Sequence, residues 1–204
     1  MESKSEFRIT SGHQIHSPCK QMSALGHRIY GPDVALPLSV LENWYAVNPD
    51  GYFLAYDNDN LIAYLLVIPI DGDEFERCLK CDFDERTTKI KAHQNWSSYH
   101  HLLLSSLVAE PAYQGKSTVS IDLRIYFFQK IIESTADSAT LFHLVGQTIS
   151  PQGEKCAISM GLSYQDLTEN QWRIYSATLN KLKLIEIKEQ LMKKRYLRLK
   201  SQTK

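Results

Sequence analysis

The sequence has little cysteine, no long apolar run and no net charge, and each absence narrows the kinds of protein it can be. Four cysteines in 204 residues are too few for a disulfide scaffold. The longest apolar run, 61–70, is about half of the ~20 residues that a membrane-spanning helix needs. The 23 Lys and Arg residues balance 23 Asp and Glu residues, which argues against a basic coat for nucleic acid.

The first residues are polar, mixed in charge and without the apolar stretch of a secretory signal. We therefore expect a cytoplasmic protein with no transmembrane segment, whose cysteines are free thiols, metal ligands or core residues. Hydrophobic residues make up 43% of the chain and charged residues 23%, as in ordinary globular proteins. A chain of this length can form one sizeable core without covalent crosslinks.

The spacing of apolar residues predicts a mixed α/β domain with both antiparallel and parallel strand neighbours. Residues 1–27 are polar with weak periodicity, which predicts an irregular arm, and the charged segment 71–98 predicts a loop with a short helix. A turn at 57–60 joins two runs that predict an antiparallel hairpin. We expect strands over 52–56, 61–70, 101–109, 139–145, 162–164 and 172–177, and helices from Pro37, over 118–133, over 151–160 and from 179 onward.

One segment places a tight, glycine-containing loop between an apolar strand and a helix. It reads Leu-Val-Ala-Glu-Pro-Ala-Tyr-Gln-Gly-Lys-Ser-Thr-Val over residues 107–119. Free N–H groups at the start of a helix bind phosphate, Gly115 lets the backbone come close to a ligand, and Lys116 adds positive charge. The alternative without a ligand is a plain turn in which Ser117 or Thr118 caps the helix.

The phosphate loop of nucleotide hydrolases is one interpretation of this segment. Gly115-Lys116-Ser117 matches the end of the G-x-x-x-x-G-K-[ST] pattern. However, the first glycine of that pattern falls on Glu110, and Pro111 lies inside the loop. The later strand over 141–146 also lacks the acid that would help to hold Mg²⁺. These departures disfavour a nucleotide hydrolase.

The same segment resembles the acyl-CoA-binding segment of the GCN5-related N-acetyltransferases (GNAT). In that superfamily a strand leads into Pro-x-Tyr and then into [Arg/Gln]-x-x-Gly-x-[Gly/Ala], and the order of elements over 36–177 agrees with the resemblance. Two departures stand out: the later glycines of the family fall on Ser117 and Val119, and its frequent general-acid tyrosine falls on Ala157. The residues that carry the likeness are Pro111, Tyr113, Gln114, Gly115 and Lys116.

The resemblance implies a GNAT-like mixed, mainly antiparallel sheet with flanking helices and two splayed central strands, 101–109 and 139–145. It implies transfer of an acyl group, most simply acetyl, from acetyl-CoA or another acyl-CoA to a primary amine of a small molecule or peptide, with no metal. The residues that would bind the co-substrate are Leu107, Val108, Ala109, Gln114, Gly115, Lys116, Ser117, Thr118 and Val119.

Direct attack by an amine needs a base and a proton donor for the departing thiolate. Glu110, at the mouth of the splay, is the candidate base, and Tyr164, just after the late motif, is the candidate donor. The departures at Ser117, Val119 and Ala157 leave an alternative open. In that alternative the chain is a non-catalytic GNAT-fold sensor of CoA esters, or a module that binds a partner.

The net charge of zero hides two unlike parts. Residues 180–204 hold nine Lys or Arg and two acids, a charge of +7, so the remainder carries −7. We divide the chain into an arm (1–27), a GNAT-like acyltransferase domain (28–178) and a basic C-terminal helix (179–204). The acidic segment 71–98 suits a cationic amine. The basic helix could fold onto the acidic body, pair with a second copy in a homodimer, or bind an anionic partner.

A structural zinc site is a weaker interpretation of the cysteines. His16 and Cys19 have the spacing of one half of such a site, and Cys78 and Cys81 have that of the other. About sixty residues separate the two halves, and we expect no metal.

Overall fold

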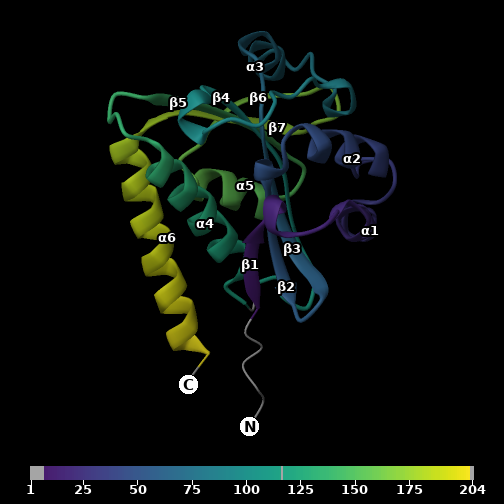
Figure 1. Cartoon of the computed structure of the whole chain (residues 1–204), viewed down its shortest axis with the longest axis vertical. Coiled ribbons are helices and arrows are strands. Elements are labelled where there is room, and N and C mark those ends of the chain that lie inside the picture. The colour runs from purple at the N-terminus through teal and green to yellow at the C-terminus, as the bar shows by residue number, and fades with distance from the viewer. Residues whose placement is uncertain (1–6, 116, 203–204) are drawn as a thin grey trace.

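A mixed seven-stranded sheet organises the described part of the chain, residues 7–115 and 117–202, in the computed structural model. Only β4 and β5 are parallel; the other neighbouring strands are antiparallel. The predicted fold class is therefore confirmed (Figure 1). The order across the sheet is β1 (Arg8–Ser11), β2 (Tyr52–Asp57), β3 (Asn60–Pro69), β4 (His101–Ala109), β5 (Leu141–Thr148), β7 (Arg173–Asn180) and β6 (Ser163–Leu167).

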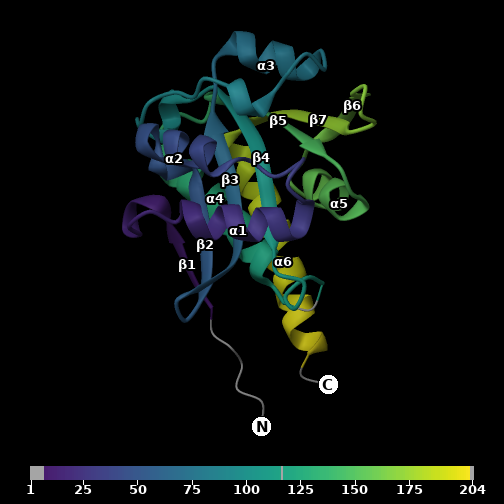
Figure 2. The same cartoon turned by 90° about the vertical axis from the view of Figure 1, so that its right-hand side faces the viewer.

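Helices cover both faces of this sheet (Figure 1). One face packs against α1 (Cys19–Tyr30), α2 (Leu38–Val47) and α3 (Gly72–Leu79), and Figure 2 looks onto the side of α1 and α2. The other packs against α4 (Val119–Ser134), α5 (Pro151–Ser159) and α6 (Lys181–Ser201). No helix among the described residues is both long and apolar enough to cross a membrane.

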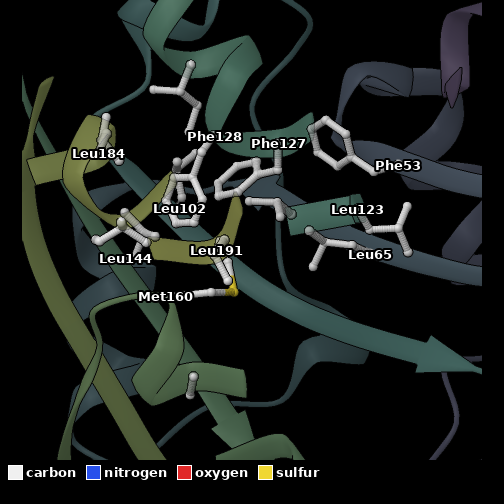
Figure 3. Packing of buried hydrophobic residues seen from close by; sticks show 14 of the residues in the cluster. Phe53, Leu65, Leu102, Leu123, Phe127, Phe128, Leu144, Met160, Leu184 and Leu191 are labelled. Carbon is white, nitrogen blue, oxygen red and sulfur yellow. The ribbon is translucent and has the colours of Figure 1, made fainter. Parts of the chain in front are cut away.

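The core between the sheet and α4 is built mainly from large aromatic and aliphatic side chains. Phe127 of α4 is fully buried and lies edge-on to Phe53 of β2, with ring centroids 5.4 Å apart. Leu184 and Leu191 bring α6 onto the same cluster (Figure 3). Burial of these apolar faces is what holds the helices on the sheet.

Two predicted features of local structure are wrong, both near the N-terminus. Residues 1–27 were expected to be irregular, but β1 pairs with β2 and α1 begins at Cys19. The edge strand takes its hydrogen bonds from the backbone of β2, which no side-chain pattern reveals. In α1 the buried side chains Cys19, Met22 and Leu25 recur every three residues, with small or polar residues between them. The division of the chain at residues 27 and 178 stays a prediction.

The parallel strands β4 and β5 separate partway along their length. Their last pair is Leu104 with Gly146, although β4 continues to Ala109 and β5 to Thr148. At this point the register against β3 passes from Ser106 opposite Leu66 to Leu104 opposite Val67, which leaves Ser105 as an extra residue in β4. A bulge of this kind bends a strand. The splay predicted between the two strands is therefore present and has a local cause.

The aromatic contact at the centre of the core gives a stability prediction. Phe127→Ala should lower the free energy of unfolding by about 3–5 kcal/mol, because it leaves a cavity in a fully buried cluster. Chemical denaturation measures this loss. Leu182→Ala in α6, where the side chain is 63% exposed, is the control and should change stability by less than about 0.5 kcal/mol. Equal effects of the two variants would contradict this description of the core.

Candidate functional site

A cleft of about 640 Å³ opens where β4 and β5 separate, and it is lined from both faces of the sheet. We call the part formed by Tyr30, Leu36, Tyr64 and Glu85 the α1 side. We call the part formed by Gly115, Arg124, Ala157 and Arg198 the α4 side. Clefts of this size and mixed polarity are typical ligand sites. The bulge thus creates a cleft that crosses the sheet.

The end of β4 forms the wall of the cleft, which Leu107, Val108 and Ala109 line; that they bind a co-substrate stays a prediction. Two of their carbonyls already have partners. Leu107 O accepts a hydrogen bond from the Tyr30 hydroxyl at 3.0 Å, and Ala109 O accepts one from the Gln114 side chain at 2.7 Å. These bonds fix α1 and the following loop against the strand.

The loop after β4 curls tightly. Gly115 has φ +69°, in the region that favours glycine, and nothing lies within 4 Å of where a Cβ would be. Gly115 and Gln114 line the cleft. The Ser117 hydroxyl donates to Tyr113 O at 2.9 Å and accepts from Val119 N at 3.3 Å, so it closes the loop onto the helix.

The remaining residues of the predicted loop have other positions. Lys116 lies outside the described residues. The Thr118 hydroxyl donates to Asp122 at 2.6 Å. The Val119 side chain is buried in the core. Ser117, Thr118 and Val119 are not among the residues that line the cleft. Their hydrogen bonds and packing instead fix the conformation of the loop and the start of α4.

Glu85 is a titratable residue at the apex of the splay, and no sequence pattern distinguishes it from the other acids of 71–98. It accepts a hydrogen bond at 3.2 Å from the hydroxyl of Ser105, the bulged residue of β4. Burial raises its pKa from 4.5 to about 8; the Ser105 bond opposes this shift and the charge of Asp84 adds to it. A carboxyl group with such a pKa exchanges protons near neutral pH.

Two tyrosines surround Glu85 on the α1 side of the cleft. Burial raises the pKa of Tyr30 to about 12, and the negative charge of Glu85 adds to that rise. Burial also raises the pKa of Tyr64, with further contributions from Tyr30 and Glu85. Both phenols are therefore neutral hydrogen-bonding groups at physiological pH. This side of the cleft can bind a polar group and exchange a proton with it.

The two residues predicted as base and donor lie outside the cleft. Glu110 forms an ion pair with Arg28 of α1, and its side chain is not part of the lining. Tyr164 lies on the edge strand β6, is 51% exposed and contacts the ring of Tyr175. Closeness in sequence to the motifs suggested both residues, but the pairing of β6 with β7 carries Tyr164 away from the splay.

Helix α5 lines the cleft with small residues and with the longer polar side chains of Gln152 and Lys155. Ala157 and Cys156 line it, and Ala157 takes the position where the resemblance would place a tyrosine. The Ser150 side chain accepts from Gly153 N at 3.1 Å and caps this helix. Helix α5 contains no tyrosine, so it supplies no phenol that could donate a proton in the cleft.

The zinc ligands considered from the sequence do not gather. Among the described residues the one group with metal-ligand spacing is His13, Asp50 and His93, rather than His16 with the cysteines. Both imidazoles lie against the Asp50 carboxylate, at 2.7 Å and 2.6 Å. None of the three residues lines the cleft.

The chain matches no protein-family model and no curated protein by sequence. Many solved structures share its fold. The loading GNATL domain of CurA from Lyngbya majuscula superposes with a TM-score of 0.58 at 11% identity, over 87% of this chain and 98% of that chain. The NatC complex bound to Gag peptide and CoA gives 0.55 at 12% identity, over 86% and 98%.

A third similar structure is the ribosomal-protein-S18-alanine N-acetyltransferase from Escherichia coli. It gives a TM-score of 0.53 at 9% identity, over 86% of this chain and 95% of that chain. The chain therefore has the fold of the GNAT superfamily, and the resemblance carried by residues 107–119 is confirmed at the level of fold.

The raised pKa of Glu85 predicts a pH-dependent stability. Glu85 loses its proton near pH 4.5 in the unfolded chain and near pH 8 in the folded one, so the folded state holds an extra proton between these values. Its stability therefore falls as pH rises through this window. Glu85→Gln removes the effect. We expect the unfolding free energy of the variant to rise relative to wild type from pH 5 to pH 8, by at most about 1.4 kcal/mol per pH unit.

Denaturation of both proteins across that pH range measures the difference. The matched control is Glu169→Gln, an exposed glutamate in the loop between β6 and β7, whose difference from wild type should stay constant. A pH-independent difference for Glu85→Gln would show that this carboxyl group titrates in the folded protein as it does in the unfolded chain.

Proposed function

We propose that this protein transfers an acyl group, most simply acetyl, from acyl-CoA directly to a primary amine. The observation that carries the proposal is the cleft at the splay, with a titratable carboxyl group at its apex and a glycine loop at its far end. The GNAT fold supports the same reaction class. Leu107, Val108 and Ala109 would lie along the pantetheine arm, and Gly115, in the loop that leads into α4, would face the phosphates.

Glu85 is the proposed general base. An amine arrives protonated and attacks only as the neutral form, so a group must accept its proton within the cleft. The Glu85 carboxyl group accepts a hydrogen bond from Ser105 at the bulge and lines the cleft together with Tyr30 and Tyr64. Its pKa of about 8 means that the carboxylate, the form that accepts a proton, becomes populated as the pH approaches 8. Glu110 is not assigned this role, because Arg28 holds its carboxylate outside the cleft.

The departing thiolate of CoA needs less assistance from the protein than the attacking amine does. As the new C–N bond forms and the C–S bond breaks, the sulfur leaves as a thiolate, whose ordinary pKa of about 8.5 makes it stable without a strong acid. Ala157 in place of a tyrosine is compatible with this chemistry. The thiolate can take its proton from water.

The α1 side of the cleft indicates the class of acceptor. Its polar groups are the Glu85 carboxyl and the hydroxyls of Tyr30 and Tyr64, and Leu36 adds an apolar surface. A carboxyl group beside phenols favours a cationic amine attached to an apolar group. Such an amine can belong to a small molecule or to a peptide.

Steady-state acetyl transfer to a panel of amines tests the assignment of the base. Glu85→Gln should lower kcat by about 10²- to 10⁴-fold and leave the Kd for acetyl-CoA within about twofold of wild type. In the wild type, kcat/KM should increase with pH to a plateau above about pH 8, following the Glu85 pKa. Glu169→Gln is the matched control and should retain activity.

Two other outcomes would favour a different base or a non-catalytic function. Loss of activity in Glu110→Gln with activity retained in Glu85→Gln would contradict the assignment of the base. The non-catalytic alternative has a specific observation in its favour, the alanine at position 157. Tight binding of acetyl-CoA by the wild type with no thiol release over the whole amine panel would support a sensor instead of an enzyme.

A further inference from the structure

We propose that the C-terminal helix α6 is part of the co-substrate site. In this arrangement Lys194 and Arg198 of α6, together with Arg124 of α4, bind phosphate groups of acyl-CoA. The choice of ligand rests on the proposed function. The existence of an anion site rests on the side chains themselves, all three of which line the cleft.

Helix α6 is fixed against the loop and the start of α4 by side chains from two of its turns. Arg195 forms an ion pair with Asp122 in the first turn of α4. Arg198 donates a hydrogen bond from Nη1 to the carbonyl oxygen of Ser117 at 2.9 Å. Leu184, Ile187 and Leu191 bury the inner face of the helix. Figure 1 shows α6 running alongside α4 over much of its length.

Arg124 is a buried cation without a counter-ion. It is 2% exposed, and it donates from Nε to Ser120 O at 2.8 Å and from Nη1 to the Ser159 hydroxyl. Within the described residues, no carboxylate lies at ion-pair distance from Arg124, Lys194 or Arg198. Burial lowers the pKa of Arg124; Cys156 opposes this shift, and the nearby charge of Arg198 adds to it.

Arg124 is the buried member of this cluster, whereas Lys194 is exposed, so the cost of an unpaired charge falls on Arg124. A buried charge needs a partner, and removal of its counter-charge is destabilising. The guanidinium group matches the geometry of phosphate oxygens and binds them in pairs of hydrogen bonds. Arg198 is hydrogen-bonded to a carbonyl oxygen of the loop that leads into α4. Free N–H groups at the start of such a helix attract phosphate. The ligand class that satisfies all of these groups is a phosphate ester.

This assignment also accounts for the unequal charge of the two parts of the chain. The acidic body neutralises Arg195 through Asp122, and Glu186 within α6 pairs with Lys183. Lys194 and Arg198 instead line the cleft. At least part of the basic charge of α6 is thus directed at the candidate site and not at a separate partner.

Calorimetric titration of the full chain with three probes tests the proposal. The probes are CoA, dephospho-CoA, which keeps only the pyrophosphate, and adenosine 3′,5′-bisphosphate, which lacks the pantetheine arm. Arg198→Ala and Lys194→Ala should each weaken CoA binding by about 10- to 100-fold. Lys193→Ala removes the same charge from an exposed position of α6 outside the cleft lining, and should stay within twofold of wild type.

The pattern across the probes identifies which phosphate is bound. Equal losses for CoA and dephospho-CoA place the two cations on the pyrophosphate, and a loss confined to CoA and the bisphosphate places them on the 3′-phosphate; both support the proposal. Arg198→Lys keeps the charge but not the paired hydrogen bonds of a guanidinium group, so its affinity should lie between those of Arg198→Ala and the wild type. Thermal unfolding of each variant shows that it is folded.

Two results separate this proposal from the proposed function. If acetyl transfer occurs but Arg198→Ala and Lys194→Ala bind CoA as tightly as Lys193→Ala does, the phosphate site is wrong and the enzyme assignment stands. If CoA binds with the expected losses but no amine is acylated, the phosphate site stands and the enzyme assignment is wrong. A wild type that binds none of the three probes would overturn the phosphate site.

Discussion

The parting of β4 and β5 after Leu104 and Gly146 is the constraint on which the rest of the site depends. A glycine favours the close approach there, because a Cβ on Gly146 would lie 3.1 Å from both the Cβ and the carbonyl oxygen of Leu104, a tight contact that needs a small shift of the neighbouring strand. One residue later the bulge at Ser105 turns β4 away. The proposed acyl transfer and the proposed phosphate site both use the cleft that results. This cleft is lined from both faces of the sheet, and Glu85 lies in it beside Ser105 of β4.

The two sides of the cleft differ in electrostatic character, because one holds a titratable carboxyl group and the other holds cations. Glu85 and two neutral phenols face the α1 side, and Arg124, Lys194 and Arg198 face the α4 side. A ligand that is anionic at one end and meets a cationic amine at the other matches this polarity. The division of charge in the sequence, −7 over residues 1–179 and +7 over 180–204, reappears as a division within one cleft because α6 folds back along α4.

The features that the sequence predicts correctly are those with a local signal. The apolar run of β4 ends at Ala109 as expected, and the hairpin of β2 and β3 follows from its turn at 57–60. The decisive side chains carry no such signal. Glu85 resembles any loop acid until 85 and 105 come together, and Arg124 resembles a solvated charge on a helix until α5 covers it. Tyr164 shows the opposite error, because nearness in sequence to a motif did not put it in the cleft.

A crystal structure of the protein with bound CoA tests the central claim most directly. The account predicts that the pantetheine arm lies between the ends of β4 and β5, with the sulfur turned toward Glu85 and the phosphates between Gly115 and the side chains of Arg124 and Arg198. A CoA molecule bound elsewhere, with the splay empty, would contradict it.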